Sequence, residues 1–292
     1  MQNKRSTPMI NTKKKKAILV YLSIIITFTF LCGVILYIVQ PYLFFHPYHD
    51  AEAYESLQGK DAFQEITIPH GDGRLHGWLH RDSSTDTAPV LILYGGNMQN
   101  SSAWFRMFDN TDTFRWFKGY DVLFVDYPGY GLSDGRPTEK SLFSAALSVY
   151  DYAQSLDSTN GNIVLMGYSI GSGVATYVAS RRNIDGLILL APYDKGLSLY
   201  NDSLNIFHGP LKLLARFEFN SATYAKQIQV APLILASQTD EVISYAHAVE
   251  LSRHFRDVKE LILLDGITHS GFLYSPQVLQ SVQSYLLSII QN

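Results

Sequence analysis

The sequence of 292 residues is poor in cysteine and has no excess of basic charge, and each shortage excludes a class of protein. Its single cysteine, Cys32, rules out an internal disulfide framework and a metal site built from cysteines. A net charge of −3 lacks the basic surface of a nucleic-acid-binding protein, so no nucleic acid is expected as a partner. Internal repeats and low-complexity segments are also absent from the sequence. With 47% hydrophobic residues, the chain can form one large folded domain plus an additional segment.

The additional segment lies at the N-terminus. Residues 17–39 form an uncharged apolar run of 23 residues, preceded by four lysines at 13–16. At 1.5 Å per residue, a helix of that length spans a hydrocarbon core of about 30 Å. A cleaved signal peptide is the alternative, but its apolar centre is shorter, about 7–15 residues, and ends at a small-x-small site that this run lacks. We therefore predict a transmembrane signal-anchor helix over residues 17–39.

Charges on the two sides of this run predict its orientation. Lysines and an arginine lie within residues 1–16, whereas acidic residues lie between positions 50 and 55. By the positive-inside rule, residues 1–16 form a basic cytoplasmic N-terminus and the large domain lies on the extracytoplasmic side, which is periplasmic, extracellular or luminal. Residues 40–61 are predicted to form an aromatic linker next to the membrane, and residues 62–292 the folded domain.

Hydrophobic patterns within residues 62–292 predict alternating strands and helices. Two alternating segments, Phe63–Pro69 and Arg74–Arg81, flank His-Gly-Asp-Gly, which is typical of an antiparallel hairpin. After the hairpin, short apolar runs with β-branched residues alternate with stretches of helical spacing. The pattern indicates an α/β fold with a mostly parallel sheet and helices on both faces. The strands predicted after the hairpin are 90–94, 121–127, 163–166, 186–192, 232–237 and 259–264.

The stretch Asn162–Ala179 is the centre of the functional prediction. An apolar strand leads directly into Gly-Tyr-Ser-Ile-Gly and then into residues at helical spacing. A G-x-S-x-G sequence between a strand and a helix is the context of a nucleophile elbow, which presents Ser169 on a strained turn. Gly131–Gly135 also fits this pattern, but no strand leads into it and no helix follows it directly. We therefore predict Ser169, and not Ser133, as a nucleophile.

Two residues downstream of Ser169 complete a candidate catalytic triad. A serine hydroxyl is a weak nucleophile unless an adjacent base, itself oriented by a third group, accepts its proton. In parallel sheets such groups come from loops at the carboxyl ends of strands, where Asp240 and His269 are predicted to lie. The chain order Ser, Asp, His is that of the α/β hydrolases. Asp194 also follows a predicted strand and is the alternative acid.

Other acidic residues and histidines have interpretations that are not catalytic. Asp126 is expected to stabilise a loop through hydrogen bonds to backbone amides, and Asp265 to shape the turn that carries His269. His208, between Phe207 and Gly209, is predicted to line the entrance of the site. Surface or packing roles are expected for four histidines: His70, His76, His80 and His247.

Acyl transfer also requires two backbone N–H groups that hold an oxyanion. Ile170, directly after Ser169, is predicted to supply one of them. Asn97 is predicted to supply the other, because the two glycines before it let the backbone approach a substrate closely. The alternative for this loop is an ordinary Gly-Gly turn.

A set of short segments within about residues 40–290 carries a family resemblance. They are F-F-H-P at 44–47, L-H-G-W at 75–78, G-N-M-Q-N at 96–100, D-Y-P-G-Y-G-L-S-D-G-R-P from 126, G-Y-S-I-G, T-D-E-V-I from 239, and T-H at 268–269. Together they resemble the membrane-anchored α/β-hydrolase-domain proteins, a branch near the serine aminopeptidase-like hydrolases. The resemblance implies Ser169 as nucleophile, Asp240 as acid and His269 as base. It also implies that Asn97 and Ile170 form the oxyanion hole.

Three departures from that family pattern concern the surroundings of the triad. Gly95-Gly96 stands where the family usually has His-Gly before the asparagine, and Ser244 stands in place of a usual proline. The segment Asp194–Gln229 is too short for a large lid and differs most from the family pattern. Substrate specificity is therefore the family property that can least be carried over to this chain.

The predicted function is that of a serine hydrolase that cleaves carboxylic esters or thioesters through an acyl-enzyme. An anchor close to the domain favours lipid-like acyl substrates, such as lysophospholipids, acylglycerols or acylated proteins, although small water-soluble esters also fit. No metal, no organic cofactor and no obligate protein partner is expected. Two alternatives stay open: an aminopeptidase or amidase of the same fold, and a catalytically inactive α/β-hydrolase fold that serves as a binding module.

Overall fold

The computed structural model describes residues 12–82, 87–156, 161–203 and 205–291, and the chain divides into two compact units between Leu43 and Phe44. The helix α1 (Thr12–Phe44) lies in the N-terminal unit up to Leu43, and its apolar side chains are mostly exposed. From Lys13 to Phe44 this helix is long and apolar enough to cross a membrane, by length and composition. It extends beyond the predicted residues 17–39 at both ends, because the lysines before that run are good helix formers and the apolar pattern continues after it.

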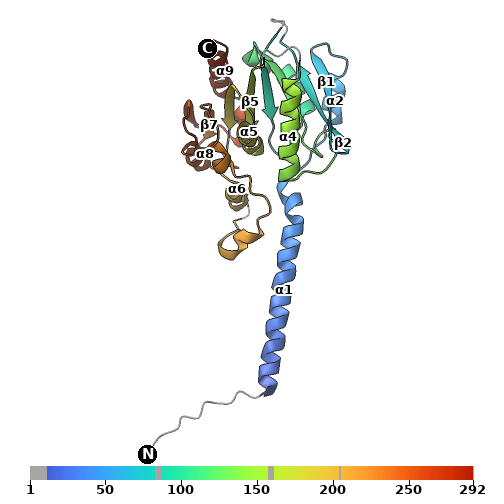
Figure 1. The fold of residues 1–292 in the computed structure, drawn as a ribbon, viewed down its shortest axis with the longest axis vertical. Coiled ribbons are helices and arrows are strands. Elements are labelled where there is room, and N and C mark those ends of the chain that lie inside the picture. The colour runs from blue at the N-terminus through green and yellow to red at the C-terminus, as the bar shows by residue number, and fades with distance from the viewer. Residues whose placement is uncertain (1–11, 83–86, 157–160, 204, 292) are drawn as a thin grey trace, which may run out of the picture. The chain divides into compact units, whose positions relative to one another are not determined.

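The second unit is built on a sheet that has eight strands among the described residues (Figure 1). Its order is β1-β2-β4-β3-β5-β6-β7-β8. β1 pairs antiparallel with β2 and β2 with β4, whereas every later pair is parallel, so the mostly parallel sheet with an antiparallel hairpin is confirmed. The strands are β1 (Phe63–His70), β2 (Gly73–His80), β3 (Val90–Tyr94), β4 (Asp121–Val125), β5 (Ile163–Tyr168), β6 (Gly186–Leu190), β7 (Leu233–Ser237) and β8 (Glu260–Leu264).

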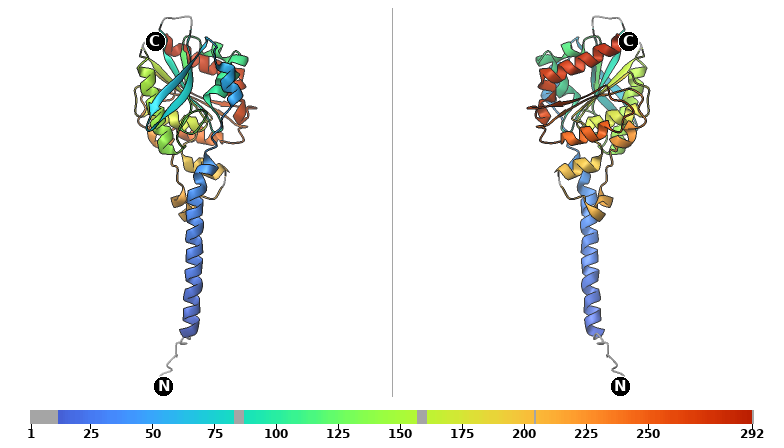
Figure 2. Two further views of the ribbon diagram at one scale, coloured as in Figure 1. Left: turned by 90° about the vertical axis from the view of Figure 1, so that its right-hand side faces the viewer. Right: turned by 90° about the vertical axis from the view of Figure 1, so that its left-hand side faces the viewer.

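Helices cover the sheet on both sides, and Figure 2 shows α9, in red, on the side opposite α4, in yellow-green. The α-helices of this unit are α2 (Ala51–Leu57), α3 (Ser101–Asn110), α4 (Glu139–Gln154), α5 (Ile170–Ala179), α6 (Gly196–Ser203), α7 (Ser221–Ala225), α8 (Tyr245–Ser252) and α9 (Pro276–Ile290). Short 3₁₀ helices follow as η1 (Thr113–Phe117), η2 (Gly209–Leu214) and η3 (His269–Tyr274).

The strands could be predicted from apolar runs in the sequence because most of them are fully buried. Every residue of β3, β4, β5, β6 and β7 is buried, as expected for strands covered on both faces. One face packs against α3 and α9 in a cluster that includes Leu91, Leu93, Trp104, Phe108, Met166, Val278 and Val282. On the other face, the hydroxyl of Tyr94 donates a hydrogen bond to the carbonyl of Ala146 in α4. β8 lies at the sheet edge and is only partly buried.

The segment predicted as a linker, residues 40–61, includes part of the core of the folded domain. The compact unit begins at Phe44, and Phe45, Ala53 and Leu57 are buried in it. α2 begins where the carboxylate of Asp50 accepts a hydrogen bond from the backbone N–H of Ala53 at 2.8 Å. The spacing of four residues between Ala53 and Leu57 puts both on one face of a helix, which is the sequence signal for α2.

Candidate active site

Ser169 lies at the turn between β5 and α5, with φ 55° and ψ −124°. A positive φ is uncommon for a residue with a Cβ, so this turn is strained, as the elbow prediction requires. Close packing makes the flanking glycines necessary. A Cβ at Gly171 would lie 2.0 Å from the carbonyl oxygen of Tyr94, and one at Gly167 would lie 2.4 Å from the carbonyl oxygen of Gly171.

We expect Gly171→Ala to destabilise the domain by about 3 kcal/mol or more, because its Cβ would overlap backbone atoms that cannot rotate away. Gly59→Ala is the control without a packing conflict. Unlike Gly171, Gly59 has a positive φ, 73°, and nothing lies within 4 Å of its added Cβ. It should cost only about 1–2 kcal/mol through backbone strain. Thermal unfolding of the full-length variants in detergent micelles measures both, and equal losses of stability would contradict the packing argument.

Ser169, His269 and Asp240 form one continuous chain of contacts. The Oγ of Ser169 lies 3.0 Å from Nε2 of His269, and Nδ1 of His269 lies 2.8 Å from Oδ2 of Asp240. The other carboxylate oxygen of Asp240 accepts the backbone N–H groups of Val242 at 2.8 Å and Ile243 at 2.9 Å. With its side chain 1% exposed, Asp240 is held in one orientation. Such a geometry lets Nδ1 donate to the carboxylate while Nε2 accepts a proton from the serine.

Two residues that the sequence analysis did not identify hold His269 in place. The hydroxyl of Tyr168 donates to the carbonyl of His269 at 2.6 Å, and the backbone N–H of His269 donates to Oε2 of Glu241 at 3.0 Å. Burial, followed by the charge of Asp240, raises the pKa of the Tyr168 hydroxyl, so this group stays a donor. Tyr168 directly precedes Ser169 in the sequence, and Glu241 directly follows Asp240. This proximity to predicted triad members was the only sequence signal for their role.

The loop after β3 places Asn97 near the start of the second unit. Its Oδ1 accepts hydrogen bonds from the backbone N–H of His46 at 2.9 Å and from the hydroxyl of Tyr130 at 2.7 Å. Its Nδ2 donates to the carbonyl of Phe44 at 2.7 Å. The next residue, Met98, has φ 58°. The side chain of Asn97 therefore fastens residues 44–46 to this loop, which leaves the backbone N–H as the group available for the predicted oxyanion role.

The second predicted donor, Ile170, is the first residue of α5. The first N–H groups of a helix have no partner within the helix and carry partial positive charge, which suits an oxyanion. The structure also gives a physical reason for the Gly-Gly departure in the opposite loop. A Cβ at Gly95 would lie 2.5 Å from the ring of Phe124, so this aromatic ring fills the space that a histidine would need.

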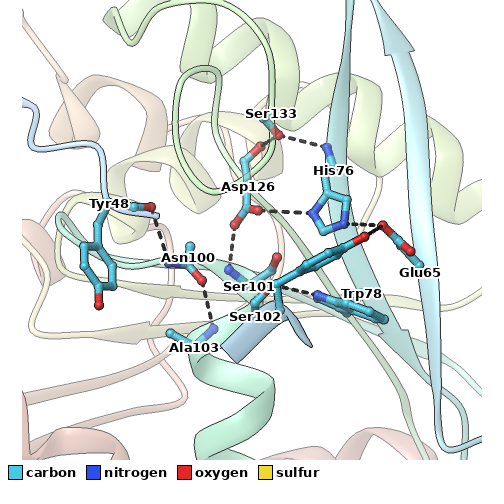
Figure 3. A network of polar contacts seen from close by, with 11 residues as sticks. Tyr48, Glu65, His76, Trp78, Asn100, Ser101, Ser102, Ala103, Asp126 and Ser133 are labelled. Atoms are coloured by element: carbon cyan, nitrogen blue, oxygen red, sulfur yellow. Dashed lines mark hydrogen bonds and ion pairs between the residues drawn. The ribbon is translucent and has the colours of Figure 1, made fainter. Parts of the chain in front are cut away.

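Asp126 and Ser133 lie in a separate buried network (Figure 3). Asp126 accepts the backbone N–H of Ser101 at 2.6 Å, which agrees with the loop-stabilising role expected for it. The Oγ of Ser133 donates to the carbonyl of Asp126 and accepts the backbone N–H of His76, both at 2.8 Å. His76 in turn contacts Asp126 at 3.5 Å and Glu65 at 2.9 Å. These contacts link β1, β2, α3 and the loop after β4, and they give Ser133 a structural role.

Asp194, the alternative acid, pairs with a different histidine. Its Oδ1 lies 3.2 Å from Nδ1 of His247, and Nε2 of His247 lies 2.8 Å from Oδ2 of Asp202 in α6. The carboxylate of Asp194, followed by that of Asp202, raises the pKa of His247 against the effect of burial. Burial raises the pKa of Asp194, but the contacts with His247 and Ser198 outweigh it and leave that pKa lowered. The group joins α8 to α6 and to the loop after β6.

These shifts predict a pH dependence of stability. Because the pKa of His247 in the fold lies above its ordinary 6.5, its stabilising effect is complete below 6.5 and is lost as the pH rises through the raised pKa. Asp194 has the opposite sign: its effect is complete above 3.8 and is lost as the pH falls through the lowered pKa. We expect the Tm difference between wild type and His247→Gln to shrink from about pH 5 to about pH 8. A difference that grows over that range would contradict this account.

The remaining histidines lie outside the contacts of Ser169. His70 Nδ1 lies 3.0 Å from the hydroxyl of Ser148, and the His80 ring stacks on Phe114 at 4.1 Å, where burial lowers the pKa of His80. His208 is exposed and bonds Asn205 at 2.8 Å. Among the described residues, no group of three or more His, Cys, Asp or Glu side chains could hold a metal ion.

Comparison with known proteins supports the fold independently. A family model described as alpha/beta hydrolase fold matches residues 88–227. The alpha/beta hydrolase domain-containing protein aho-3 of Caenorhabditis elegans is 25% identical over 167 residues, which cover 57% of this chain and 48% of that protein. This chain thus spans about half the length of that relative.

Solved structures share the same architecture. Est1E from Butyrivibrio proteoclasticus, solved with ferulic acid bound, has a TM-score of 0.66 at 21% identity and covers 78% of this chain and 100% of its own. The Pyrococcus furiosus esterase Pf2001 has a TM-score of 0.66 at 17% identity, covering 84% of this chain and 97% of its own. The family match, the sheet topology and these similarities show that the chain has the alpha/beta hydrolase fold, and its sequence is similar to those of alpha/beta hydrolase domain-containing proteins.

Proposed function

We propose that this chain is a membrane-anchored serine hydrolase that cleaves carboxylic ester or thioester bonds of acyl substrates. The observation that carries the proposal is the chain of contacts from Ser169 through His269 to Asp240 at a strained strand-to-helix turn. Two structural neighbours support the choice of bond, because one is named an esterase and the other was solved with ferulic acid bound.

Each residue has a defined part in the proposed reaction. Nε2 of His269 takes the proton of the Ser169 hydroxyl as Oγ attacks the carbonyl carbon, and Asp240 stabilises the imidazolium that forms. The backbone N–H groups of Ile170 and Asn97 hold the oxyanion of the tetrahedral intermediate. His269 then protonates the departing alkoxide or thiolate, which leaves an acyl-enzyme on Ser169. Water, deprotonated by His269, attacks this ester and releases the acid.

The apolar helix α1 supports the membrane part of the proposal. Its length and composition suit a membrane span, and its N-terminal lysines favour a cytoplasmic position for the residues before it. The hydrolase domain then lies on the extracytoplasmic side. A protease-protection assay on spheroplasts or right-side-out vesicles, whose outer face is the extracytoplasmic face, tests this orientation: protease added outside should digest the domain. Protection of the whole domain would reverse the topology.

Hydrolysis assays on the full-length protein test the reaction class. We expect turnover of esters and thioesters with an initial burst of alcohol or thiol release, as an acyl-enzyme predicts, and little turnover of amides with the same acyl chain. Amide hydrolysis at least as fast as ester hydrolysis would favour the aminopeptidase or amidase alternative. A folded protein that turns over none of these substrates would favour a binding module.

A further inference from the structure

The loop between α6 and α7 combines apolar and basic residues on its surface. Residues 205–216 read N-I-F-H-G-P-L-K-L-L-A-R, with two cations, Lys212 and Arg216, and no acidic residue. None of the residues of η2, which lies in this loop, is buried. Leu213 is 89% exposed and Leu211 46% exposed. Figure 1 shows this orange segment extending beyond α6, away from the sheet. Leu211 and Leu213 are thus exposed apolar side chains gathered in one short segment, and gathered rather than scattered exposed apolar side chains indicate a contact surface.

Aromatic residues on both sides of the exposed leucines are buried in the domain, so the fold itself fixes where the exposed part of the loop begins and ends. At one end Phe207 is fully buried, its ring lies 4.8 Å from that of Tyr200, and its backbone N–H donates to Asn201 at 3.0 Å. At the other end Phe217 is buried against Phe45, with ring centroids 4.9 Å apart. The chain thus holds the leucines outward between two anchored aromatic residues.

Contacts between this loop and the end of α1 indicate what the exposed leucines bind. Phe44 is the last residue of α1, and within the second unit its ring lies 5.6 Å from that of Phe217. Leu213 is four residues before Phe217 and so lies within about 14 Å of it. If α1 spans a bilayer, Phe44 marks the membrane surface, and the exposed leucines lie within reach of that same surface.

We propose that residues 205–216, with Leu211 and Leu213 as the inserted residues, dock onto the phospholipid bilayer in which the chain is anchored. The leucines enter the boundary between headgroups and acyl chains, and Lys212 and Arg216 contact anionic lipid headgroups while their aliphatic stems cover apolar surface. Docking would give the domain a membrane contact besides the anchor and hold it at the surface where lipid substrates lie. This inference rests on the proposed anchoring and deepens the proposed function.

A depth measurement on the full-length chain tests the docking. Cys32 is the only cysteine, so Cys32→Ser gives a background in which Leu213→Cys can carry a single NBD fluorophore. The labelled protein is placed in nanodiscs of phosphatidylcholine and phosphatidylglycerol, with or without nitroxide-labelled lipid. We expect blue-shifted emission that the nitroxide lipid quenches. Ser284→Cys, at an exposed position of α9, is the control and should show aqueous emission without quenching.

Three results would overturn the proposal or separate it from the proposed chemistry. Aqueous emission at position 213 without quenching would overturn it. Blue-shifted emission without lipid quenching would also overturn it, because a second copy or another protein would then cover the leucines. The fluorescence does not depend on turnover, so an inactive protein with a quenched probe would refute the hydrolase proposal and keep the docking.

A charge variant tests the part assigned to the cations. Lys212→Glu in the Leu213→Cys background should weaken quenching in nanodiscs that contain phosphatidylglycerol and have a smaller effect in pure phosphatidylcholine. Lys226→Glu, at an exposed lysine outside the loop, is the matched control. Equal effects of the two variants on quenching would remove Lys212 from the docking surface.

Discussion

Ser169→Ala is expected to lower the kcat for ester hydrolysis by about five to six orders of magnitude, the loss typical when a catalytic triad loses its nucleophile. The physical reason is that alanine lacks the hydroxyl whose proton His269 takes; in the wild type its Oγ lies 3.0 Å from Nε2 of His269. Triad members act as a unit, so Ser169→Ala combined with His269→Ala should be hardly worse than either variant alone. Steady-state assays of the full-length variants with one activated ester measure all three.

Ser133→Ala is the matched control for this substitution, since both serines occupy the centre of a G-x-S-x-G sequence. Ser133 bonds only backbone groups of Asp126 and His76 in the contacts described above, so its loss should cost about 1–3 kcal/mol of stability. The kcat of the folded variant should stay within a few-fold of wild type. A Ser169→Ala protein with undiminished ester hydrolysis would refute the assignment of the nucleophile.

Asp240→Asn is expected to lower kcat by about four orders of magnitude while the domain stays folded. The asparagine keeps the shape of the side chain but can present an N–H to Nδ1 of His269, which favours the wrong tautomer of the imidazole. The charge that stabilises the imidazolium is lost as well. Activity against pH in wild type and variant, with circular dichroism to check the fold, measures the effect.

The alternative acid provides the control for Asp240. Asp194 is also a buried aspartate after a strand, but it contacts His247 at 3.2 Å and belongs to a different ion-pair group. Asp194→Asn should therefore lower the Tm and leave kcat nearly unchanged. If Asp194→Asn abolished turnover while Asp240→Asn did not, Asp194 would be the acid and the proposed triad would be wrong.

The sheet and the elbow could be predicted because their signals are local. Strands such as β3 and β7 are buried on both faces, so five consecutive residues are apolar or small and the run is visible in the sequence. The elbow could be separated from the second G-x-S-x-G match because a strand precedes it and a helix follows it. In each case, residues close in sequence determine the structure.

Contacts between distant residues could not be predicted in this way. Asn97 bonds Phe44 and His46, which lie 53 and 51 positions away, and no local pattern indicates that pairing. Tyr168 bonds the carbonyl of His269 at a separation of 101 residues. His247 was expected to be a surface or packing residue, and its contacts with Asp194 and Asp202 arise only when α8, α6 and the loop after β6 meet.

Labelling of the purified full-length protein with a fluorophosphonate probe tests the central claim most directly, because the probe reacts with a serine whose hydroxyl has been activated by a neighbouring base. Wild type, Ser169→Ala and Ser133→Ala are compared under the same conditions. The proposal predicts that wild type and Ser133→Ala are labelled and that Ser169→Ala is not. Labelling that persists in Ser169→Ala, or a folded wild type that takes up no label, would contradict the proposal that Ser169 is an activated nucleophile.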